Sequence, residues 1–324
     1  MSKQTAMQST KRFVGLGVAV LAAFAGLLAG CKDKGPTPTA GKPVIGVSLL
    51  TMTNPFFKDI ADAMQAEAAK HGYEVIVTSG ELDPARQKDQ VKDFLVRKVN
   101  AIVLAPCDSK SIGTAIAEAN KAGVPVFTAD IACLAEGAKI VTHVATDNLE
   151  GGRVAGREMV SLLGGKGKIA IIDHPMVESG MLRTKGFDEE IAKAPGIKVV
   201  AKLPGQGARD KSFAVAQDIL QGNPDLDAIF AINDPSALGV IAAIEKAGKA
   251  DKVKVIGFDG QLEARQAVKE GKLHATVMQY PKQIGTMTIV AISKYMAGEK
   301  PVPQLLIPTG IYRQADAMKD VELK

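Results

Sequence analysis

The sequence predicts an α/β protein built as two doubly wound parallel-sheet lobes. Short apolar runs rich in β-branched residues alternate with longer amphipathic stretches from residue 44 onward. Continuous apolar strands alternating with helices are typical of parallel sheets that helices cover on both faces. About ten strands is large for one such sheet, and a chain of 324 residues is long for one core. Two sheets therefore fit the chain better than one.

The elements follow in regular order. Strands are predicted at residues 44–50, 75–77, 101–104, 124–127, 169–172, 199–200, 228–232, 253–258 and 273–278. The first helix carries an apolar stripe at helical spacing (Phe57, Ile60, Ala61, Met64 and Ala68). The second opens at Asp83-Pro84, a capping residue followed by proline. Further helices are expected near 111–122, 149–163, 183–193, 210–221, 236–247, 261–271 and 282–297. The break between the lobes is predicted after residues 144–148, where a polar cap precedes a helix.

Composition excludes several classes of protein. The formal net charge is +5, and removal of an amino-terminal segment carrying Lys3, Lys11 and Arg12 would leave +2. A nearly neutral chain without a clustered basic face gives no case for nucleic-acid binding. The three cysteines do not form a disulfide scaffold, and no spacing among them resembles a zinc site.

The amino terminus has the pattern of an export signal. Lys11 and Arg12 form a positive region, and residues 13–30 then run without a charge up to Cys31. The closing Leu-Ala-Gly-Cys box resembles that of bacterial lipoprotein signals, which implies cleavage after residue 30 and lipidation of Cys31. The alternative is a transmembrane anchor, but the run is near the lower length limit for spanning and rich in small residues. Residues 31–43, with frequent Pro, Gly and Thr, are expected to form a tether.

Two adjacent aromatic residues mark the first strand-to-helix junction. Asn54 is a preferred N-cap and Pro55 suits the first helical position, so Phe56 and Phe57 stand at the carboxyl end of a strand, where α/β proteins bind ligands. Aromatic residues are only 4% of the chain, which makes the pair more informative. The rings could cover the face of a flat small molecule such as a sugar, or they could be ordinary core residues.

Polar residues follow several other predicted strands. They are Asp108, Asp130, Asn233 with Asp234, Asp259 and Gln279, and Arg183 is expected at a helix start. Carboxylates, amides and one guanidinium that converge on a crevice suit a neutral polyhydroxylated ligand, because each hydroxyl both donates and accepts. Any one of the Asp and Asn residues could instead be a helix cap. The whole set, together with the phenylalanines, favours a binding site.

The sequence gives little support for an enzyme. There is no Gly-x-Ser-x-Gly elbow, and residues 164–168 lack the upstream glycine of a phosphate loop. The four histidines (His71, His143, His174 and His274) show no metal spacing and are expected at the surface or in loops. Export would also separate the protein from ATP and NAD. We therefore expect no catalytic residues, no cofactor and no metal.

Several segments together resemble the periplasmic ribose-binding protein family, the type I sugar-binding proteins of ABC importers. They are residues 53–57, 230–234, 237–239, 255–260, 275–279 and 283–285, and the resemblance covers about residues 43–315. It implies two lobes joined by a three-segment hinge near residues 147, 279 and 308. The amino-terminal lobe would comprise 44–146 and 280–308, and the carboxy-terminal lobe 147–279 and 309–324. It also implies that Phe56 and Phe57 pack against a sugar ring and that Asn54, Asp130, Arg183, Asn233, Asp259 and Gln279 bind its hydroxyls.

Three positions depart from the pattern of ribose binders. Ala105 and Ile131 stand where ribose binders have Asn and Arg, and Gly207 lies near the place of a further aromatic residue. The pocket should therefore be less tuned to ribose, so that another monosaccharide or a polyol becomes a candidate.

The implied function is that of a monomeric, lipid-anchored protein of the periplasm or cell surface that captures a monosaccharide, a ribose-like pentose or a hexose, and delivers it to an ABC permease. A sugar sensor for a membrane receptor is the alternative. Sugar-responsive repressors share the two-lobe body, but they carry a helix-turn-helix head where this chain has an export signal. Cys107 and Cys133 follow neighbouring strands and could either form a disulfide or remain two free thiols.

Overall fold

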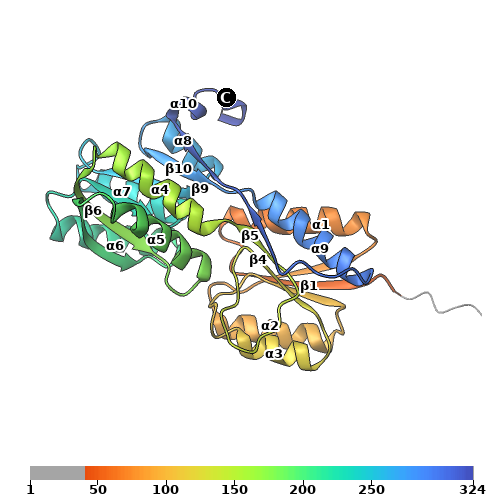
Figure 1. The fold of residues 1–324 in the computed structure, drawn as a ribbon. Coiled ribbons are helices and arrows are strands. Elements are labelled where there is room, and N and C mark those ends of the chain that lie inside the picture. Colours follow the sequence, from red (N-terminus) through yellow and green to blue (C-terminus); the bar gives the residue numbers. More distant parts are fainter. Residues whose placement is uncertain (1–40, 324) are drawn as a thin grey trace, which may run out of the picture. The chain divides into compact units, whose positions relative to one another are not determined.

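The computed structural model describes residues 41–323 (Figure 1). The predicted signal peptide, Cys31 and most of the predicted tether lie outside these residues. Within residues 41–323, no helix has both the length and the apolar character needed to cross a membrane.

The first sheet has six strands in the order β11-β5-β4-β3-β1-β2, and every neighbouring pair is parallel. The strands are β1 (Val44–Leu49), β2 (Glu74–Ser79), β3 (Ala101–Leu104), β4 (Val126–Ala129), β5 (His143–Thr146) and β11 (Gln304–Ile307). The central strands β3 and β4 are buried along their whole length, which explains their continuous apolar sequence.

The second sheet also has six strands, in the order β12-β10-β9-β8-β6-β7. They are β6 (Lys166–Asp173), β7 (Gly196–Pro204), β8 (Ala228–Ala231), β9 (Lys254–Asp259), β10 (Ala275–Met278) and β12 (Gly310–Arg313). Only the edge strand β12 is antiparallel to its neighbour. The prediction of two parallel-sheet α/β lobes is thus confirmed.

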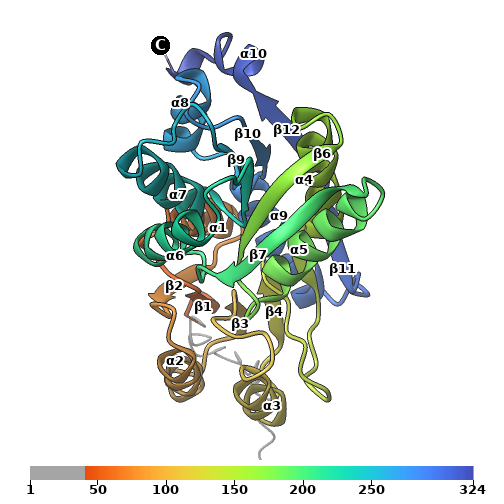
Figure 2. The same cartoon turned by 90° about the vertical axis from the view of Figure 1, so that its left-hand side faces the viewer.

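Helices cover both faces of each sheet. On the first sheet, α1 (Pro55–Lys70) and α9 (Pro281–Met296) cover one face, and α2 (Pro84–Val96) and α3 (Gly113–Lys121) the other. On the second, α4 (Asn148–Leu162) and α5 (Glu178–Ile191) cover one face. The opposite face is covered by α6 (Arg209–Gly222), α7 (Asp234–Lys246) and α8 (Leu262–Lys269) (Figure 2). The short helices α10 (Gln314–Ala317) and η1 (Val321–Leu323) follow β12.

Some element boundaries differ from the prediction. Helix α5 begins at Glu178, so Arg183 lies in its second turn and not at a helix start. The search for continuous apolar runs in the sequence did not identify β5, β11 or β12. Both β11 and β12 are four-residue edge strands with partly exposed side chains, and such strands carry no continuous apolar pattern.

The chain passes between the two sheets three times. The crossings connect β5 to α4, β10 to α9 and β11 to β12. They are tied together by hydrogen bonds, because Asp147 N donates to Ile307 O at 2.9 Å and Thr309 Oγ1 donates to Met278 O at 2.5 Å.

Both cysteines of the described body are free thiols. Cys107 is buried with its Sγ 3.5 Å from Leu50 O, and burial raises the pKa of its thiol to about 12. The sequence left open either a disulfide between Cys107 and Cys133 or two free thiols, and the structure contains two free thiols.

The packing of α4 on α5 depends on glycine and gives a first prediction. A Cβ on Gly152 would lie 2.1 Å from the carbonyl oxygen of Arg183 on α5. We expect Gly152→Ala to lower the free energy of unfolding by about 1–3 kcal/mol, the usual cost of overpacking. Urea unfolding followed by circular dichroism measures it. The control is Gly222→Ala at the end of α6, where a Cβ would meet no atom within 4 Å; equal stability of the two variants would contradict this packing.

Candidate functional site

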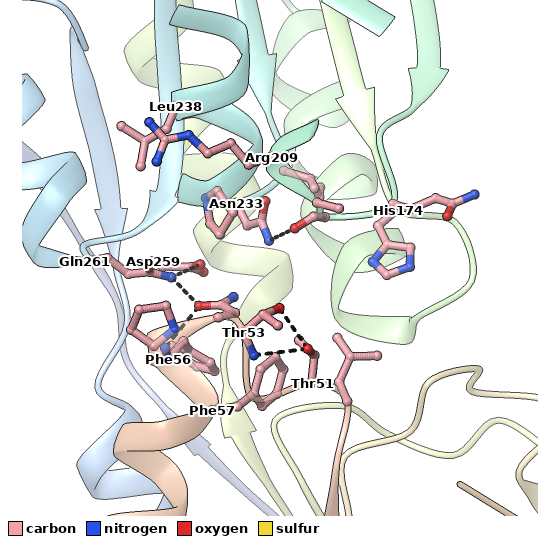
Figure 3. A pocket seen from close by; sticks show the side chains of 18 of the residues that line it. Thr51, Thr53, Phe56, Phe57, His174, Arg209, Asn233, Leu238, Asp259 and Gln261 are labelled. Atoms are coloured by element: carbon pink, nitrogen blue, oxygen red, sulfur yellow. Dashed lines mark hydrogen bonds between the residues drawn. The ribbon is translucent and has the colours of Figure 1, made fainter. Parts of the chain in front are cut away.

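A cleft of about 980 Å³ lies where the carboxyl ends of the strands in the two sheets face one another. Residues from both lobes line it, and they include all eight candidates from the sequence: Asn54, Phe56, Phe57, Asp130, Arg183, Asn233, Asp259 and Gln279. Figure 3 shows part of this set around a common space. Residues predicted from their positions after strands are thus far apart in the chain and together in the cleft. The 2.7 Å hydrogen bond between Asn54 and Gln261, 207 positions apart, shows how the two lobes meet there.

The amino-terminal end of α1 forms one wall of the cleft. Asn54 Oδ1 accepts a hydrogen bond from Phe56 N at 3.0 Å, as an N-cap does, and another from Gln261 Nε2 of the second lobe at 2.7 Å. The rings of Phe56 and Phe57 are each 3% exposed and meet edge to face at 5.4 Å between centroids. Both rings belong to the core of the first lobe and also line the cleft. The two interpretations of this pair, core residues and cover for a ligand, are therefore compatible.

Arg183 and Asp259 form the centre of the opposite wall. Arg183 Nη1 donates to Asp259 Oδ1 at 3.3 Å, and both side chains are almost fully buried. The guanidinium is held in place by Asn148 Oδ1, which accepts from Nε at 2.8 Å, and by the Phe258 ring 3.9 Å beneath it. Gln279 Nε2 donates to the same carboxylate at 2.6 Å.

The backbone at two of the carboxylates is strained. Asp130, directly after β4, has a φ of 65°, and Asp259, the last residue of β9, has a φ of 126°. Positive φ is unfavourable for residues with a Cβ and is concentrated at functional sites. In both cases the unusual conformation occurs at the end of a central strand, beside the cleft.

Burial changes the protonation of these carboxyl groups. It raises the pKa of Asp130 to about 7, although the charge of Arg183 opposes the change. Burial also raises the pKa of Asp259, again against the effect of Arg183. Asp234 lies behind them with its carboxylate bonded to Thr276 Oγ1 and to Gln261 N, and burial raises its pKa strongly.

Two buried oxygen atoms in the cleft lack hydrogen-bond partners in the structure. They are Asp130 Oδ1 and Gln279 Oε1, and both residues line the cleft. A buried polar atom without a partner costs free energy, and native proteins keep few of them. These acceptors are suited to bind the hydroxyl protons of a small molecule.

The other polar residues after strands have different roles. Asn233 both caps α7, by accepting from Ser236 N at 3.0 Å, and lines the cleft. Asp108 is not among the cleft residues and caps its own loop by accepting from Lys110 N and Ser111 N. For Asp108 the capping alternative is therefore the correct one.

Sequence reasoning missed some cleft residues and was wrong about one histidine. His143 was expected at the surface or in a loop, but it lies inside β5 and is only 7% exposed. His174 lies in a loop, as expected, but it is also only 7% exposed. His174 lines the cleft. It directly follows β6, so the same search for polar residues after predicted strands could have found it. Gln261 was also missed, although it stands two residues after Asp259.

Two of the three positions that depart from the ribose-binding pattern face the cleft. Ile131 and Gly207 line it, and neither offers a side-chain hydrogen bond. Ala105 is fully buried and is not among the lining residues. Among residues 41–323, no group of three or more His, Cys, Asp or Glu side chains is placed to hold a metal ion.

The two lobes also touch beside the cleft, through the β6–α5 loop (residues 174–177). Ser109 N of the first lobe donates to Met176 O at 3.0 Å, and its Oγ accepts from Glu178 N at 2.9 Å. The side chain of Val177, 3% exposed, packs within the core cluster of the first lobe. The structure is thus a conformation in which the lobes are joined by direct contacts.

Comparison with known proteins gives consistent matches. A family model described as periplasmic binding protein domain matches residues 45–300. The ribose import binding protein of Salmonella typhimurium is 38% identical over 260 residues, which cover 80% of this chain and 86% of that protein. The D-apiose import binding protein of Paraburkholderia graminis is 31% identical over 93% of this chain and 94% of its own length.

A similar structure is that of an ABC transporter solute binding protein from Bacillus halodurans with bound myo-inositol. It is 31% identical and superposes with a TM-score of 0.80, covering 87% of this chain and 98% of that one.

The raised pKa of Asp130 gives a second prediction. Between about pH 4, the pKa of an unfolded Asp, and about pH 7, the folded protein holds a proton that the unfolded chain has released. The contribution of Asp130 to stability therefore falls as pH rises through this window and is constant above it. We expect the stability of Asp130→Asn, relative to the unchanged protein, to increase across this window in urea unfolding. The control is Asp251→Asn at an exposed turn, and a pH-independent difference for Asp130→Asn would contradict the assignment.

Proposed function

Because the chain belongs to the periplasmic binding protein family, we propose that it captures a monosaccharide or polyol in the cleft and delivers it to an ABC importer. Proteins of this family are substrate-binding components of transporters, not enzymes. The observation that carries the proposal is the pair of unpartnered buried acceptors, Asp130 Oδ1 and Gln279 Oε1, beside the Arg183–Asp259 contact.

The chemistry of the cleft suits an uncharged ligand with several hydroxyl groups. Asp130, Asp259 and Gln279 can accept hydroxyl protons, and Arg183 and Asn233 can donate to hydroxyl oxygens. Hydrogen bonds to charged groups are about twice as strong as neutral ones. The rings of Phe56 and Phe57 would cover the C–H face of a sugar ring. A strongly charged ligand would be less suitable, because its charge would be buried beside carboxylates that share a single guanidinium, that of Arg183.

The choice of a sugar or polyol agrees with the relatives, whose names and bound molecule refer to ribose, D-apiose and myo-inositol. Ile131 and Gly207 offer no side-chain hydrogen bond to such a ligand, so we do not propose ribose itself. A ligand in the cleft would contact both lobes and would favour the joined conformation by its differential affinity for it. The three crossings near residues 147, 279 and 308 would then act as hinges.

We propose an amino-terminal lobe of residues 44–146 and 280–308 and a carboxy-terminal lobe of residues 147–279 and 309–324. The two sheets and the three crossings between them support these boundaries. We also propose that the protein acts as a monomer, since one chain supplies both walls of the cleft.

A third prediction tests ligand binding by thermal shift with a panel of monosaccharides and polyols. Ligand at a hundredfold excess over its dissociation constant should add about 2.7 kcal/mol to the free energy of unfolding. We expect at least one sugar or polyol to raise the melting temperature and Asp259→Asn to weaken its binding by about tenfold or more, because a bond to a charged group is lost. The matched control is Asp108→Asn, the same change at a cap outside the cleft. Absence of any shift, or an undiminished shift in Asp259→Asn, would refute the proposed site.

Lipid anchoring is the fourth prediction. The box that ends in Cys31 supports cleavage after residue 30 and attachment of lipid to the cysteine, which would hold the protein at a membrane surface in the periplasm or on the cell exterior. In cells given labelled palmitate, we expect the protein to carry label and to partition into detergent. Cys31→Ser should abolish both, whereas Cys133→Ser, a control in the folded body, should change neither. Labelling that persists in Cys31→Ser would exclude this anchor.

A further inference from the structure

His174 is a buried polar residue of the cleft that has no structural partner. The other buried or half-buried histidines are hydrogen-bonded, His143 to Thr128 Oγ1 and His274 to Glu158 Oε1, each at 2.9 Å. The residue is 7% exposed and lines the cleft, and its side chain has no hydrogen-bond partner among residues 41–323. Neither ring nitrogen is among the fully buried atoms that lack a partner, so both keep some exposed surface. The ring is therefore available to a ligand in the cleft.

The ring of His174 is uncharged under ordinary conditions. Burial lowers its pKa to about 4, with the nearby charges of Lys211 and Arg183 acting in the same direction. A neutral imidazole has one nitrogen that donates and one that accepts. It can therefore bind a hydroxyl group without bringing a charge into the cleft.

Gly207 keeps open the space beside this ring. Its φ is +66°, and a Cβ at this position would lie 3.1 Å from Asn233 Nδ2 and 3.2 Å from His174 Nδ1. Any other residue would therefore place atoms between these two groups. Asn233 Nδ2 uses one hydrogen on Gly207 O at 3.0 Å and has a second one to donate.

The hydrogen-bonding side chains of the cleft extend across it in Figure 3. Asp259 and Gln261 lie on one side of the space, His174 lies on the other, and Asn233 lies between them. A ligand bound at the Arg183–Asp259 contact would need an additional hydroxyl to reach His174 and Asn233.

On the basis of the proposed function, we infer that His174 and Asn233, with Gly207 between them, form a second hydroxyl-binding position that selects six-carbon sugars and cyclitols over pentoses. A pentopyranose lacks the hydroxymethyl group that a hexopyranose carries at C5. In a hexose this hydroxyl, and in a cyclitol a ring hydroxyl, donates to or accepts from the imidazole and accepts from Asn233.

The fifth prediction tests this selectivity by titration calorimetry with pairs of sugars that differ only in the C5 hydroxymethyl group. The pairs are D-ribose with D-allose and D-xylose with D-glucose, and myo-inositol is added. We expect a six-carbon ligand to bind at least about tenfold more tightly than its pentose partner, the value of one hydrogen bond. His174→Phe, which keeps a flat ring without nitrogens, should remove that advantage and change pentose affinity by less than about threefold. His174→Asn, whose carboxamide again offers a donor and an acceptor, should recover part of this advantage.

Gly207→Ala provides a second test, because its methyl group should exclude the hydroxymethyl and spare the pentose. The control is His71→Phe at the exposed end of α1, which should leave both affinities unchanged. Equal losses for pentose and hexose, or no loss in either variant, would overturn the role of His174 while leaving the sugar site intact. Absence of binding by every sugar and by myo-inositol would instead overturn the proposed function together with this inference.

Discussion

The buried contact between Arg183 and Asp259 is the interaction on which the cleft depends. The same guanidinium also donates to Ile232 O at 3.0 Å and to Asn148 Oδ1 at 2.8 Å, so it connects α5 to β9, to the end of β8 and to the start of α4. Removal of one partner from a buried ion pair costs about 3–5 kcal/mol, because the other charge is left uncompensated. The close approach of α4 and α5 at Gly152 places the arginine where this pairing is possible.

One carboxylate near this contact still has an oxygen without a partner, Asp130 Oδ1. Asp130 and Asp259 lie near a single arginine, and burial raises the pKa of both carboxyl groups. Hydroxyl groups can satisfy such acceptors without adding charge, which is why an uncharged polyhydroxylated ligand is the best match. Ser109 and Val177 also make contacts between the lobes. The free energy that holds the lobes together therefore does not come from the ligand alone.

The sequence predicted the fold and several polar residues of the cleft because both depend on local patterns. Buried parallel strands are continuous apolar runs, and the residues after them meet at one edge of the sheet, which identified Asp130, Asp259 and Gln279. The same rule also selected Asp108, since a cap and a cleft residue have the same sequence signature. His174 directly follows β6 and could have been found in the same way, whereas its burial depends on packing between distant segments and has no local signature. The edge strands β11 and β12 were missed because half-exposed strands lack an apolar run.

A crystal structure of the protein with a bound monosaccharide or polyol tests the central claim most directly. We expect Asp130 Oδ1 and Gln279 Oε1, which have no partner in the present structure, each to accept a hydrogen bond from a ligand hydroxyl at about 2.5–3.2 Å. The ligand should lie between Phe57 and the Arg183–Asp259 contact. A complex in which both oxygens remain without a bond to the ligand, or in which the ligand lies outside this cleft, would contradict the claim.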